Sequence, residues 1–296
     1  MPDTMNDMSI AFPHLHLYLP YVPKDFTIFG FRIAMYGVII GIGMMLAVSL
    51  AAYVAKKTGQ KPDDYWDLSI YLVIFSVMGA RLYYVIFSWD LYKNDLLQIL
   101  NIRNGGLAIY GGVIVGFITL FVYVKKKKQS YFLMADTGVY GLILGQIIGR
   151  WGNFCNREAF GDYTDNLFAM RLPLSMIRPN EITTLMREHI VEGTNYIQVH
   201  PTFLYESLWN LMILILMLLY LHHKKFDGEL MLFYLGGYGL GRGLIETLRT
   251  DQLHLWNTNI PVSQMLGFSL FVLAVVADVV VRYRMHAKII EKQNKK

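Results

Sequence analysis

Long apolar runs, each about as long as a membrane-crossing helix, recur along the chain between short polar connections. A helix needs about 20 mostly apolar residues to cross the hydrocarbon core of a bilayer. The runs are continuously apolar rather than alternating, which argues against a membrane β-barrel. We therefore predict an all-α, polytopic membrane protein that forms one integral-membrane domain over residues 1–296. Its seven transmembrane helices are expected at about 33–54, 66–88, 106–124, 133–150, 203–221, 229–247 and 262–281.

The basic residues fall mainly on one side of the predicted spans. The connections after the odd-numbered spans, together with the tail that ends in Lys295 and Lys296, hold 15 of the 27 lysines and arginines. Cytoplasmic loops carry such an excess of basic residues. We therefore expect the N-terminus outside, the C-terminus inside, and residues 156–200 as a small extracytoplasmic cap between spans four and five.

Composition supports a membrane protein and narrows its chemistry. Only 17% of the residues are charged, whereas about a quarter are in an average soluble domain. The net charge of +5 comes from lysines in short loops, so we predict no nucleic-acid partner. The single cysteine, Cys155, excludes an internal disulfide and a thiolate-rich metal site, and we interpret it as inert packing. We predict no metal and no cofactor. Residues 1–24 lack the basic and apolar segments of a cleaved signal peptide.

A dense polar segment interrupts the chain at the end of the fourth predicted span. Residues 139–148 carry no charge, and then residues 149–161 bring two arginines, two asparagines, a glutamate and three glycines. Glycines let the backbone approach a ligand closely, and a forked guanidinium beside amide donors suits a phosphate. We predict a binding site here for an anionic ligand, formed by Arg150, Asn153, Asn156, Glu158 and Gly161.

Other polar residues are predicted at the same, outer ends of their spans. Arg32 and Tyr36 lie four residues apart at the start of span one, on one helical face. Arg81 lies roughly 22 Å along span two from Trp66, at about 1.5 Å per residue. An arginine at that depth is expensive unless it is paired, so we expect an acidic or phosphate partner for it.

The sixth predicted span ends with four polar residues on one helical face. Tyr238, Arg242, Glu246 and Arg249 are spaced by 4, 4 and 3 residues, which keeps them aligned on a helix. We expect Glu246 to neutralise part of Arg242, whose guanidinium has more N–H groups than one carboxylate accepts. The glycines of this span are expected to allow close helix packing.

The segment Gly149-Arg150-x-Gly-Asn153-Phe-x-Asn156-x-Glu158-x-x-Gly161 resembles the signature of bacterial prolipoprotein diacylglyceryl transferases. Further blocks resemble that family in the same order along the chain. They are Tyr36-Gly37, Gly79-Ala80-Arg81, residues 105–112, His200-Pro201 with Leu204-Tyr205-Glu206, and Gly239 with Arg242, Glu246 and Arg249.

The resemblance implies an enzyme of the bacterial plasma membrane whose active site faces the outer leaflet. Such an enzyme moves the diacylglyceryl group of phosphatidylglycerol onto the lipobox cysteine of a preprolipoprotein, forming a thioether and releasing glycerol phosphate. The resemblance implies catalytic roles for Arg150, Arg242 and Tyr110. Substrate contacts are expected at Arg150, Asn153, Asn156, Glu158, Gly161, Tyr36, Arg81, Tyr238, Glu246 and Arg249.

One position departs from the commonest family pattern. Many members have a histidine, proposed as a base, where this chain has Tyr110. A neutral phenol donates hydrogen bonds well but is a poor base. We therefore expect Tyr110 to position the thiol or the phosphate. From the residues alone, a transporter or binding protein for an anionic lipid headgroup remains an alternative, although the matched inverted halves that would favour a transporter are not evident.

Overall fold

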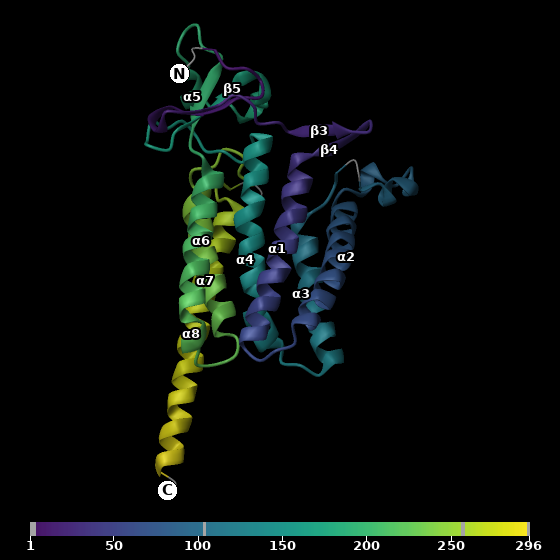
Figure 1. Ribbon diagram of the computed structural model, residues 1–296, viewed down its shortest axis with the longest axis vertical. Helices are drawn as coiled ribbons and strands as arrows, with labels where there is room; N and C mark the ends of the chain where they lie inside the picture. Colours follow the sequence, from purple (N-terminus) through teal and green to yellow (C-terminus); the bar gives the residue numbers. More distant parts are fainter. Residues whose placement is uncertain (1–3, 103–104, 256–257, 295–296) are drawn as a thin grey trace. The chain divides into compact units, whose positions relative to one another are not determined.

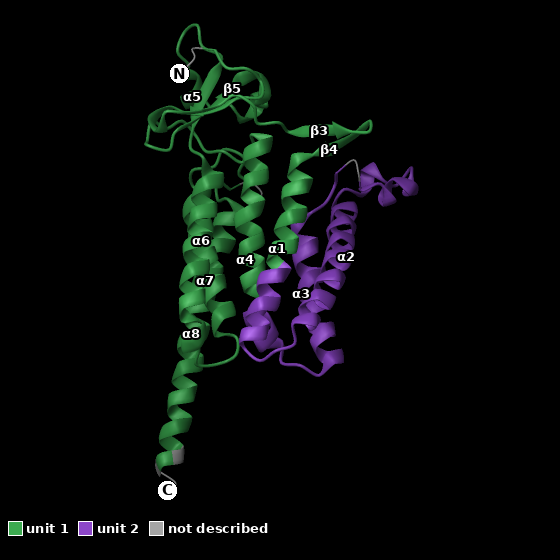
Figure 2. Ribbon diagram, in the orientation of Figure 1, with its two compact units in different colours: residues 1–47, 139–296 green, residues 48–138 purple. Residues whose placement is uncertain are grey.

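The computed structural model describes residues 4–102, 105–255 and 258–294, so Lys295 and Lys296 of the predicted cytoplasmic tail lie outside the described residues. The chain forms two compact units, coloured separately in Figure 2. The first unit comprises residues 1–47 and 139–296, and the second comprises residues 48–138.

Helices account for 66% of the structure. Seven long helices overlap the seven predicted runs (Figure 1): α1 Met35–Lys57, α2 Pro62–Phe87, α3 Ile109–Lys127, α4 Tyr131–Asn156, α6 Thr202–Tyr220, α7 Glu229–Glu246 and α8 Val262–Asn294. The short helix α5 spans Thr184–Glu188. Short 3-10 turns are η1 Pro13–Leu15, η2 Trp89–Leu91, η3 Leu96–Leu100, η5 Leu174–Met176, η6 Pro179–Glu181 and η7 Leu221–His223.

Among the described residues, six helices are long and apolar enough to cross a membrane, namely Met35–Lys57, Pro62–Phe87, Ile109–Lys127, Tyr131–Asn156, Thr202–His223 and Val262–Glu291. This composition, with the family membership reported below, indicates a multi-pass membrane protein. Helix α7 is not among the six, because its 18 residues include Glu229, Arg242 and Glu246.

The first unit also contains β-structure, so the prediction of an all-α protein is wrong for these residues. Four short strands form an antiparallel sheet in the order β2-β1-β5-β6. They are β1 Ile10–Phe12, β2 Leu17–Leu19, β5 Met170–Pro173 and β6 Tyr196–Val199. The strands are only three or four residues long, too short for an alternating pattern to stand out in the sequence.

The sheet covers one end of helices α4 and α6 within the first unit (Figure 1). Its core contains Ile10 and Phe12 from the N-terminal segment, together with Leu172 and Ile197 from β5 and β6. Phe154 of α4 and Phe203 of α6 belong to the same core, with ring centroids 4.8 Å apart. Residues 156–200 therefore share their core with the N-terminal strands and with two helix ends.

A second, two-stranded sheet precedes α1 and corrects the prediction for Arg32. Strands β3 Asp25–Ile28 and β4 Phe31–Ala34 pair around a turn in which Phe29 and Gly30 have φ of 49° and 81°. Arg32 lies on β4 and pairs with Asp25, whereas Tyr36 lies in the first turn of α1. The two side chains therefore do not share a helical face.

Glycines allow close helix packing in the first unit, as predicted for α7. A Cβ placed on Gly239 would lie 2.5 Å from the carbonyl oxygen of Gly267 on α8. A Cβ on Gly241 would lie 2.1 Å from the indole nitrogen of Trp209 on α6. The indole nitrogen in turn donates a hydrogen bond to the Gly237 carbonyl at 2.9 Å. Helix α7 thus lies directly against both neighbours, which positions the charged residues near its C-terminal end.

Candidate active site

Glu206 is the centre of a buried ion cluster in the first unit. Its side chain, on the first turns of α6, is only 5% exposed. Arg150 of α4 pairs with Oε2 of Glu206, and Arg242 of α7 donates to Oε1 at 2.8 Å. Nη1 of Arg249 lies 3.5 Å from the same Oε1. One carboxylate therefore holds three guanidinium groups that come from separate segments of the chain.

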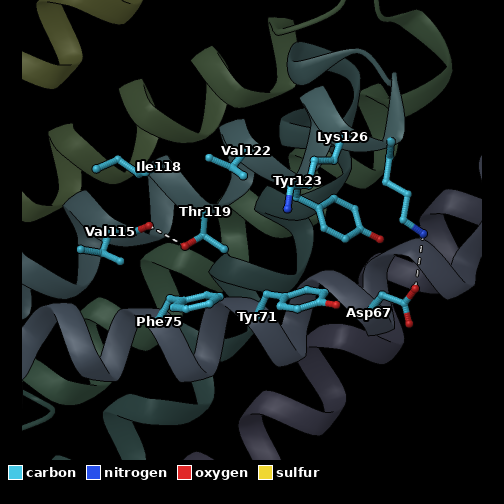
Figure 3. Close-up of a pocket in the computed structure, with 10 residues that line it drawn as sticks. Asp67, Tyr71, Phe75, Val115, Ile118, Thr119, Val122, Tyr123 and Lys126 are labelled. Atoms are coloured by element: carbon cyan, nitrogen blue, oxygen red, sulfur yellow. Dashed lines mark hydrogen bonds and ion pairs between the residues drawn. The ribbon is translucent and has the colours of Figure 1, made fainter.

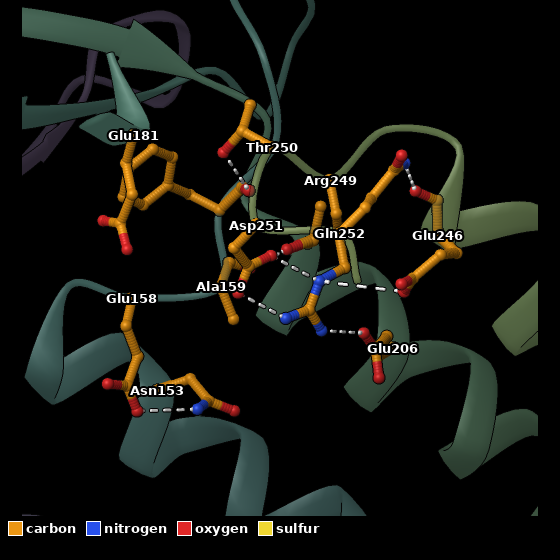
Figure 4. Close-up of polar contacts among 12 residues, drawn as sticks. Asn153, Glu158, Ala159, Glu181, Glu206, Glu246, Arg249, Thr250, Asp251 and Gln252 are labelled. Atoms are coloured by element: carbon orange, nitrogen blue, oxygen red, sulfur yellow. Dashed lines mark hydrogen bonds and ion pairs between the residues drawn. The ribbon is translucent and has the colours of Figure 1, made fainter. Parts of the chain in front are cut away.

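Two more carboxylates complete the charge balance of this cluster. Glu246, one turn after Arg242 on α7, lies 2.7 Å from its Nη2, which confirms the predicted i, i+4 pair. Asp251 accepts from Nε and Nη2 of Arg249 at 2.9 and 2.7 Å (Figure 4). We call these six residues the arginine–carboxylate cluster: Arg150, Arg242, Arg249, Glu206, Glu246 and Asp251. Three positive and three negative charges make the cluster neutral as a set.

Residues just after α7 anchor the arginine–carboxylate cluster. Burial by itself would raise the pKa of Asp251, but the hydrogen bonds and charge of Arg249 outweigh burial and lower that pKa. The amide of Gln252 donates to the backbone carbonyl of Glu246, which closes the end of α7 (Figure 4). Arg249 lies beyond the last helical residue, Glu246, so it reaches the cluster from a turn rather than from the predicted helical face.

The three arginines differ in how many of their nitrogens are engaged within the described residues. A guanidinium has three nitrogens that carry five N–H groups. Arg150 uses one nitrogen, on Glu206. Arg242 uses two, on Glu206 and Glu246, and Arg249 uses all three, on Asp251, Glu206 and Glu246. Arg150 therefore has the largest remaining capacity to bind an anion.

A second acceptor group forms where α4 ends. Glu158 Oε1 accepts from the side-chain amides of Asn153 and Asn156 at 2.9 and 3.2 Å. The chain bends back because Arg157 and Ala159 adopt left-handed φ angles of 58° and 55°, an arrangement common after helix ends. Arg157 is held there by hydrogen bonds from its guanidinium to the carbonyls of Cys155 and Val22. The two asparagines and Glu158 thus converge, as the motif predicted.

Gly161 lies where three segments of the first unit meet. Its N–H donates to the His200 carbonyl at 2.9 Å, and the next N–H, of Asp162, donates to the Leu248 carbonyl at 3.0 Å. A Cβ on Gly161 would stand 2.6 Å from the Leu248 oxygen and 2.8 Å from the His200 Cβ. The absence of a side chain at Gly161 therefore lets the chain after α4, the start of α6 and the end of α7 approach one another.

Two aromatic residues named by the sequence lie beside these groups. The ring of Tyr36 packs on Gly152, where an added Cβ would be 2.6 Å from the ring. Tyr36 is also within electrostatic range of both Arg150 and Glu158. Tyr238 is half-buried on α7 and stacks on Tyr234, with ring centroids 5.7 Å apart. Tyr36 therefore lies close to both polar groups of the site.

Comparison with known proteins assigns the chain to a family. Residues 23–280 match the family described as prolipoprotein diacylglyceryl transferase. The chain belongs to this family. A relative from Clostridioides difficile (strain 630), called phosphatidylglycerol–prolipoprotein diacylglyceryl transferase, is 41% identical over 230 residues, 78% of this chain and 84% of the relative. A relative of the same name from Finegoldia magna is 36% identical over 271 residues, which are 91% of this chain and 98% of the relative.

Membership of the prolipoprotein diacylglyceryl transferase family confirms the resemblance drawn from the motifs. The first unit contains ten of the predicted site residues: Arg150, Asn153, Asn156, Glu158, Gly161, Tyr36, Tyr238, Arg242, Glu246 and Arg249. Arg81 and Tyr110 belong to the second unit. Tyr110 is half-buried in the first turn of α3.

The prediction that Arg81 pairs with an acidic or phosphate group is wrong. Its guanidinium donates to five backbone carbonyls, those of Gln98, Ile99, Asn101, Gly105 and Gly106, at 2.6 to 3.1 Å. These five hydrogen bonds equal its five N–H groups. Arg81 therefore fastens the segment before α3 to α2, and a phosphate would have to displace a carbonyl to bind it.

Two carboxylates of the arginine–carboxylate cluster were not predicted from the sequence. Glu206 appeared only as part of a motif block, although a carboxylate within an apolar run is itself a signal of function or pairing. Asp251 had no such signal, because it lies in a polar loop where an aspartate is ordinary. Nearby, burial raises the pKa of Glu181, Arg178 opposes that rise, and the charges of Asp251 and Glu158 add to it (Figure 4). Glu181 was not predicted from the sequence either.

Proposed function

We propose that this protein transfers the diacylglyceryl group of phosphatidylglycerol to the cysteine thiol of prolipoproteins. Its family membership supports a transferase, and the name of its relatives specifies the lipid donor and the protein acceptor. The observation in the site that best supports the chemistry is Arg150, which lies in a buried ion cluster and has two nitrogens unengaged among the described residues. Neither the family nor the site favours the transporter alternative.

The reaction requires stabilisation of a leaving phosphate. The acceptor sulfur forms a bond to the terminal glyceryl carbon of the diacylglyceryl group while the bond from that carbon to the phosphate oxygen breaks. The thiol loses its proton, and glycerol phosphate leaves with the electron pair of the broken bond. Guanidinium donors fixed beforehand in a site of low polarity stabilise charge that develops on the phosphate.

We assign the phosphate contact to Arg150 and Arg242 because both keep unengaged nitrogens. Glu206 and Arg249 act as positioning residues: Glu206 touches all three arginines, and Arg249 has every nitrogen committed to a carboxylate. A shared carboxylate fixes the guanidinium directions before the substrate arrives. Because its charge is balanced, the cluster avoids the cost of burying an excess of arginines.

The Glu158 group is proposed to bind the glycerol part of the headgroup. Asn153 and Asn156 both donate to Oε1 of Glu158, and no described residue donates to Oε2. A carboxylate oxygen accepts hydrogen bonds from hydroxyls, and the glycerol headgroup carries hydroxyl donors. Tyr36 would line the space between Arg150 and Glu158. Tyr110 is proposed, from the motif alone, to position the thiol or the phosphate.

We propose that the protein crosses the plasma membrane seven times, with α7 as a span in addition to the six apolar helices. The buried glutamates and Arg242 of α7 are paired within the first unit, which lowers the cost of placing them in a membrane. The lysine distribution supports an external N-terminus and an internal C-terminus. Residues 156–200 would then form part of an extracytoplasmic cap, and the arginine–carboxylate cluster would face the outer leaflet.

Product analysis with purified full-length protein tests the proposed reaction. Vesicles should contain phosphatidylglycerol labelled separately in an acyl chain and in the headgroup glycerol, with a lipobox peptide as acceptor. We expect the acyl label on the peptide cysteine and the headgroup label in glycerol phosphate, in equal amounts. A lipobox cysteine-to-serine peptide is the acceptor control. Movement of intact lipid between leaflets, without labelled peptide, would instead support the transporter alternative.

A further inference from the structure

The second unit contains a groove that plays no part in the proposed reaction. It lies between α2 and α3, has a volume of about 620 Å³, and is called the α2–α3 groove here. Asp67, Tyr71 and Phe75 follow one another at intervals of four residues along α2 and face α3 (Figure 3). Val115 and Lys127 mark the two ends of the α3 wall. All lining residues lie within residues 67–127, so none belongs to the arginine–carboxylate cluster.

The packing of the two helices explains the position of the groove. A Cβ on Gly79 of α2 would lie 2.8 Å from the carbonyl oxygen of Gly111 on α3, and a Cβ on Gly111 would lie 2.3 Å from the Gly79 oxygen. The backbones are therefore in contact at this end. Further along the helices, the large rings of Tyr71 and Tyr123 meet with centroids 6.0 Å apart. The groove runs from beside the close backbone contact, past these two rings, to Asp67 and Lys126.

The dimensions of the groove match one leaflet of a membrane. From Val115 to Lys126 the α3 wall rises roughly 16 Å, at about 1.5 Å per residue. Half of a bilayer hydrocarbon core is about 15 Å. Phe75, Ile118 and Val122 line the groove with 42%, 55% and 45% of their surface exposed. In a helix that crosses a membrane, such side chains contact acyl chains rather than water.

The polar end of the groove is positively charged. The helix ends and loops in residues 55–67 and 124–136 carry seven lysines against four aspartates. Lys127 is engaged, because its Nζ lies 3.1 Å from Asp64 and 3.5 Å from Asp67. Lys126 also lines the groove, is exposed, and has no hydrogen bond or ion pair to any described residue. It offers an unengaged ammonium group at the depth of a lipid phosphate.

We propose that the α2–α3 groove binds an anionic glycerophospholipid as a resident lipid. Lys126 contacts its phosphate, and one acyl chain lies along Tyr71, Phe75 and Val122. The excess of lysines selects an anionic headgroup over a zwitterionic one. This lipid is proposed as a resident and not as the donor in transfer, because none of the lining residues is among those assigned to the reaction.

Site-resolved photocrosslinking tests this assignment. Full-length protein is reconstituted in vesicles that contain a trace of phosphatidylglycerol with a diazirine in one acyl chain, or phosphatidylcholine with the same chains. Crosslinked peptides from residues 67–75 and 115–127 are then quantified. We expect the phosphatidylglycerol probe to label these segments several-fold more than the phosphatidylcholine probe. A lysine near an anionic headgroup contributes to the binding free energy of the lipid. We therefore expect Lys126→Ala to lower this labelling about five-fold.

A matched lysine serves as the control. Lys125→Ala removes an exposed lysine that neighbours Lys126 but does not line the groove, and it should leave the labelling unchanged. Val122→Trp, which fills the groove, should lower labelling with Lys126 intact. Equal labelling by both probes, or an unchanged Lys126→Ala protein, would overturn the assignment and leave only ordinary lipid contact. The readout is independent of diacylglyceryl transfer, so it fails or succeeds separately from the proposed function.

Discussion

At the scale of single residues, a carboxylate determines where the arginines point. Glu206 contacts Arg150, Arg242 and Arg249 while it is almost fully buried. Removing one partner of a buried charge pair typically costs about 3–5 kcal/mol, because the remaining charges lose their compensation. The same change frees the three guanidinium groups to reorient.

We therefore expect Glu206→Gln to lower both the thermal unfolding midpoint and the rate of diacylglyceryl transfer. Glutamine keeps the shape and one acceptor oxygen, so the loss reports on charge. The measurement compares thermal unfolding with kcat and KM in detergent. Glu188→Gln, at an exposed glutamate of α5, is the control and should match the parent. A Glu206→Gln protein with parental stability and kcat would remove Glu206 from its positioning role.

Tyr110 provides a second test at this scale. We expect Tyr110→Phe to retain more transfer activity than Arg150→Lys, because the phenol is proposed to position a substrate group rather than to accept a proton. Tyr110→His should also remain active, since the family resemblance implies that a histidine can fill this position. Transfer rates of the three proteins across pH 5–9 make the comparison. Two results together would make Tyr110 a base. The Phe variant would fold but be inactive, and the parent's transfer rate would change at a basic pH that the His variant shifts toward neutral.

Some residue roles could be predicted from the sequence and others could not. The grouping of Asn153, Asn156 and Glu158 was predictable, because these polar residues follow an uninterrupted apolar run. Arg81 was assigned wrongly because a guanidinium can be satisfied by backbone carbonyls, and their positions depend on a folded loop. The central role of Glu206 depends on three segments meeting, which one sequence does not reveal.

At the scale of elements, Gly161 connects the chain after α4 to α6 and α7. Gly161→Ala would place a Cβ 2.6 Å from a backbone oxygen that belongs to the turn after α7. Such overpacking typically costs about 1–3 kcal/mol. We expect a lower unfolding midpoint and at least a roughly ten-fold loss of transfer, because Arg249 pairs with the cluster from that turn.

A helical glycine with free space gives the matched comparison for Gly161. No atom lies within 4 Å of a Cβ placed on Gly138. Gly138→Ala should therefore be neutral or stabilising, by up to about 1 kcal/mol. If Gly161→Ala unfolds and turns over like Gly138→Ala, the close approach of the three segments is not needed.

The long helices were predictable and the strands were not, for a physical reason. Each apolar run, such as residues 33–54, is long enough to specify a helix by itself, and α1 follows it closely. Met170–Pro173 pairs with Ile10–Phe12 and with Tyr196–Val199, which are distant from it in sequence. Leu17–Leu19 pairs locally with Ile10–Phe12, but both strands are too short for an alternating pattern to stand out. Arg32 was misplaced because the turn at Phe29 and Gly30 folds residues 31–34 back onto residues 25–28, so that Arg32 lies in a hairpin and α1 begins only at Met35.

At the scale of the whole molecule, the direction of the chain across the membrane is open to direct measurement. Asp165 is exposed in the segment between α4 and α6, with 64% of its side chain accessible. Asp165→Cys in a Cys155→Ala background should react with an impermeant thiol reagent in intact cells. Lys125→Cys in the same background should react only after permeabilisation. The reverse pattern would contradict an external cap.

The central claim is that unengaged guanidinium nitrogens bind the leaving phosphate. The rate of diacylglyceryl transfer by an Arg150→Lys protein tests this claim most directly. Lysine keeps the charge but loses the forked geometry. The matched control is Arg171→Lys. Arg171 lies on β5, and its Nε donates a hydrogen bond to the side chain of Gln198 on β6 at 3.0 Å. The assay uses phosphatidylglycerol vesicles and a lipobox peptide. We expect Arg150→Lys to lose about 2–4 kcal/mol of transition-state stabilisation, which lowers kcat/KM roughly 30- to 1,000-fold. Arg171→Lys should match the parent. A folded Arg150→Lys protein with parental kcat/KM would contradict the account.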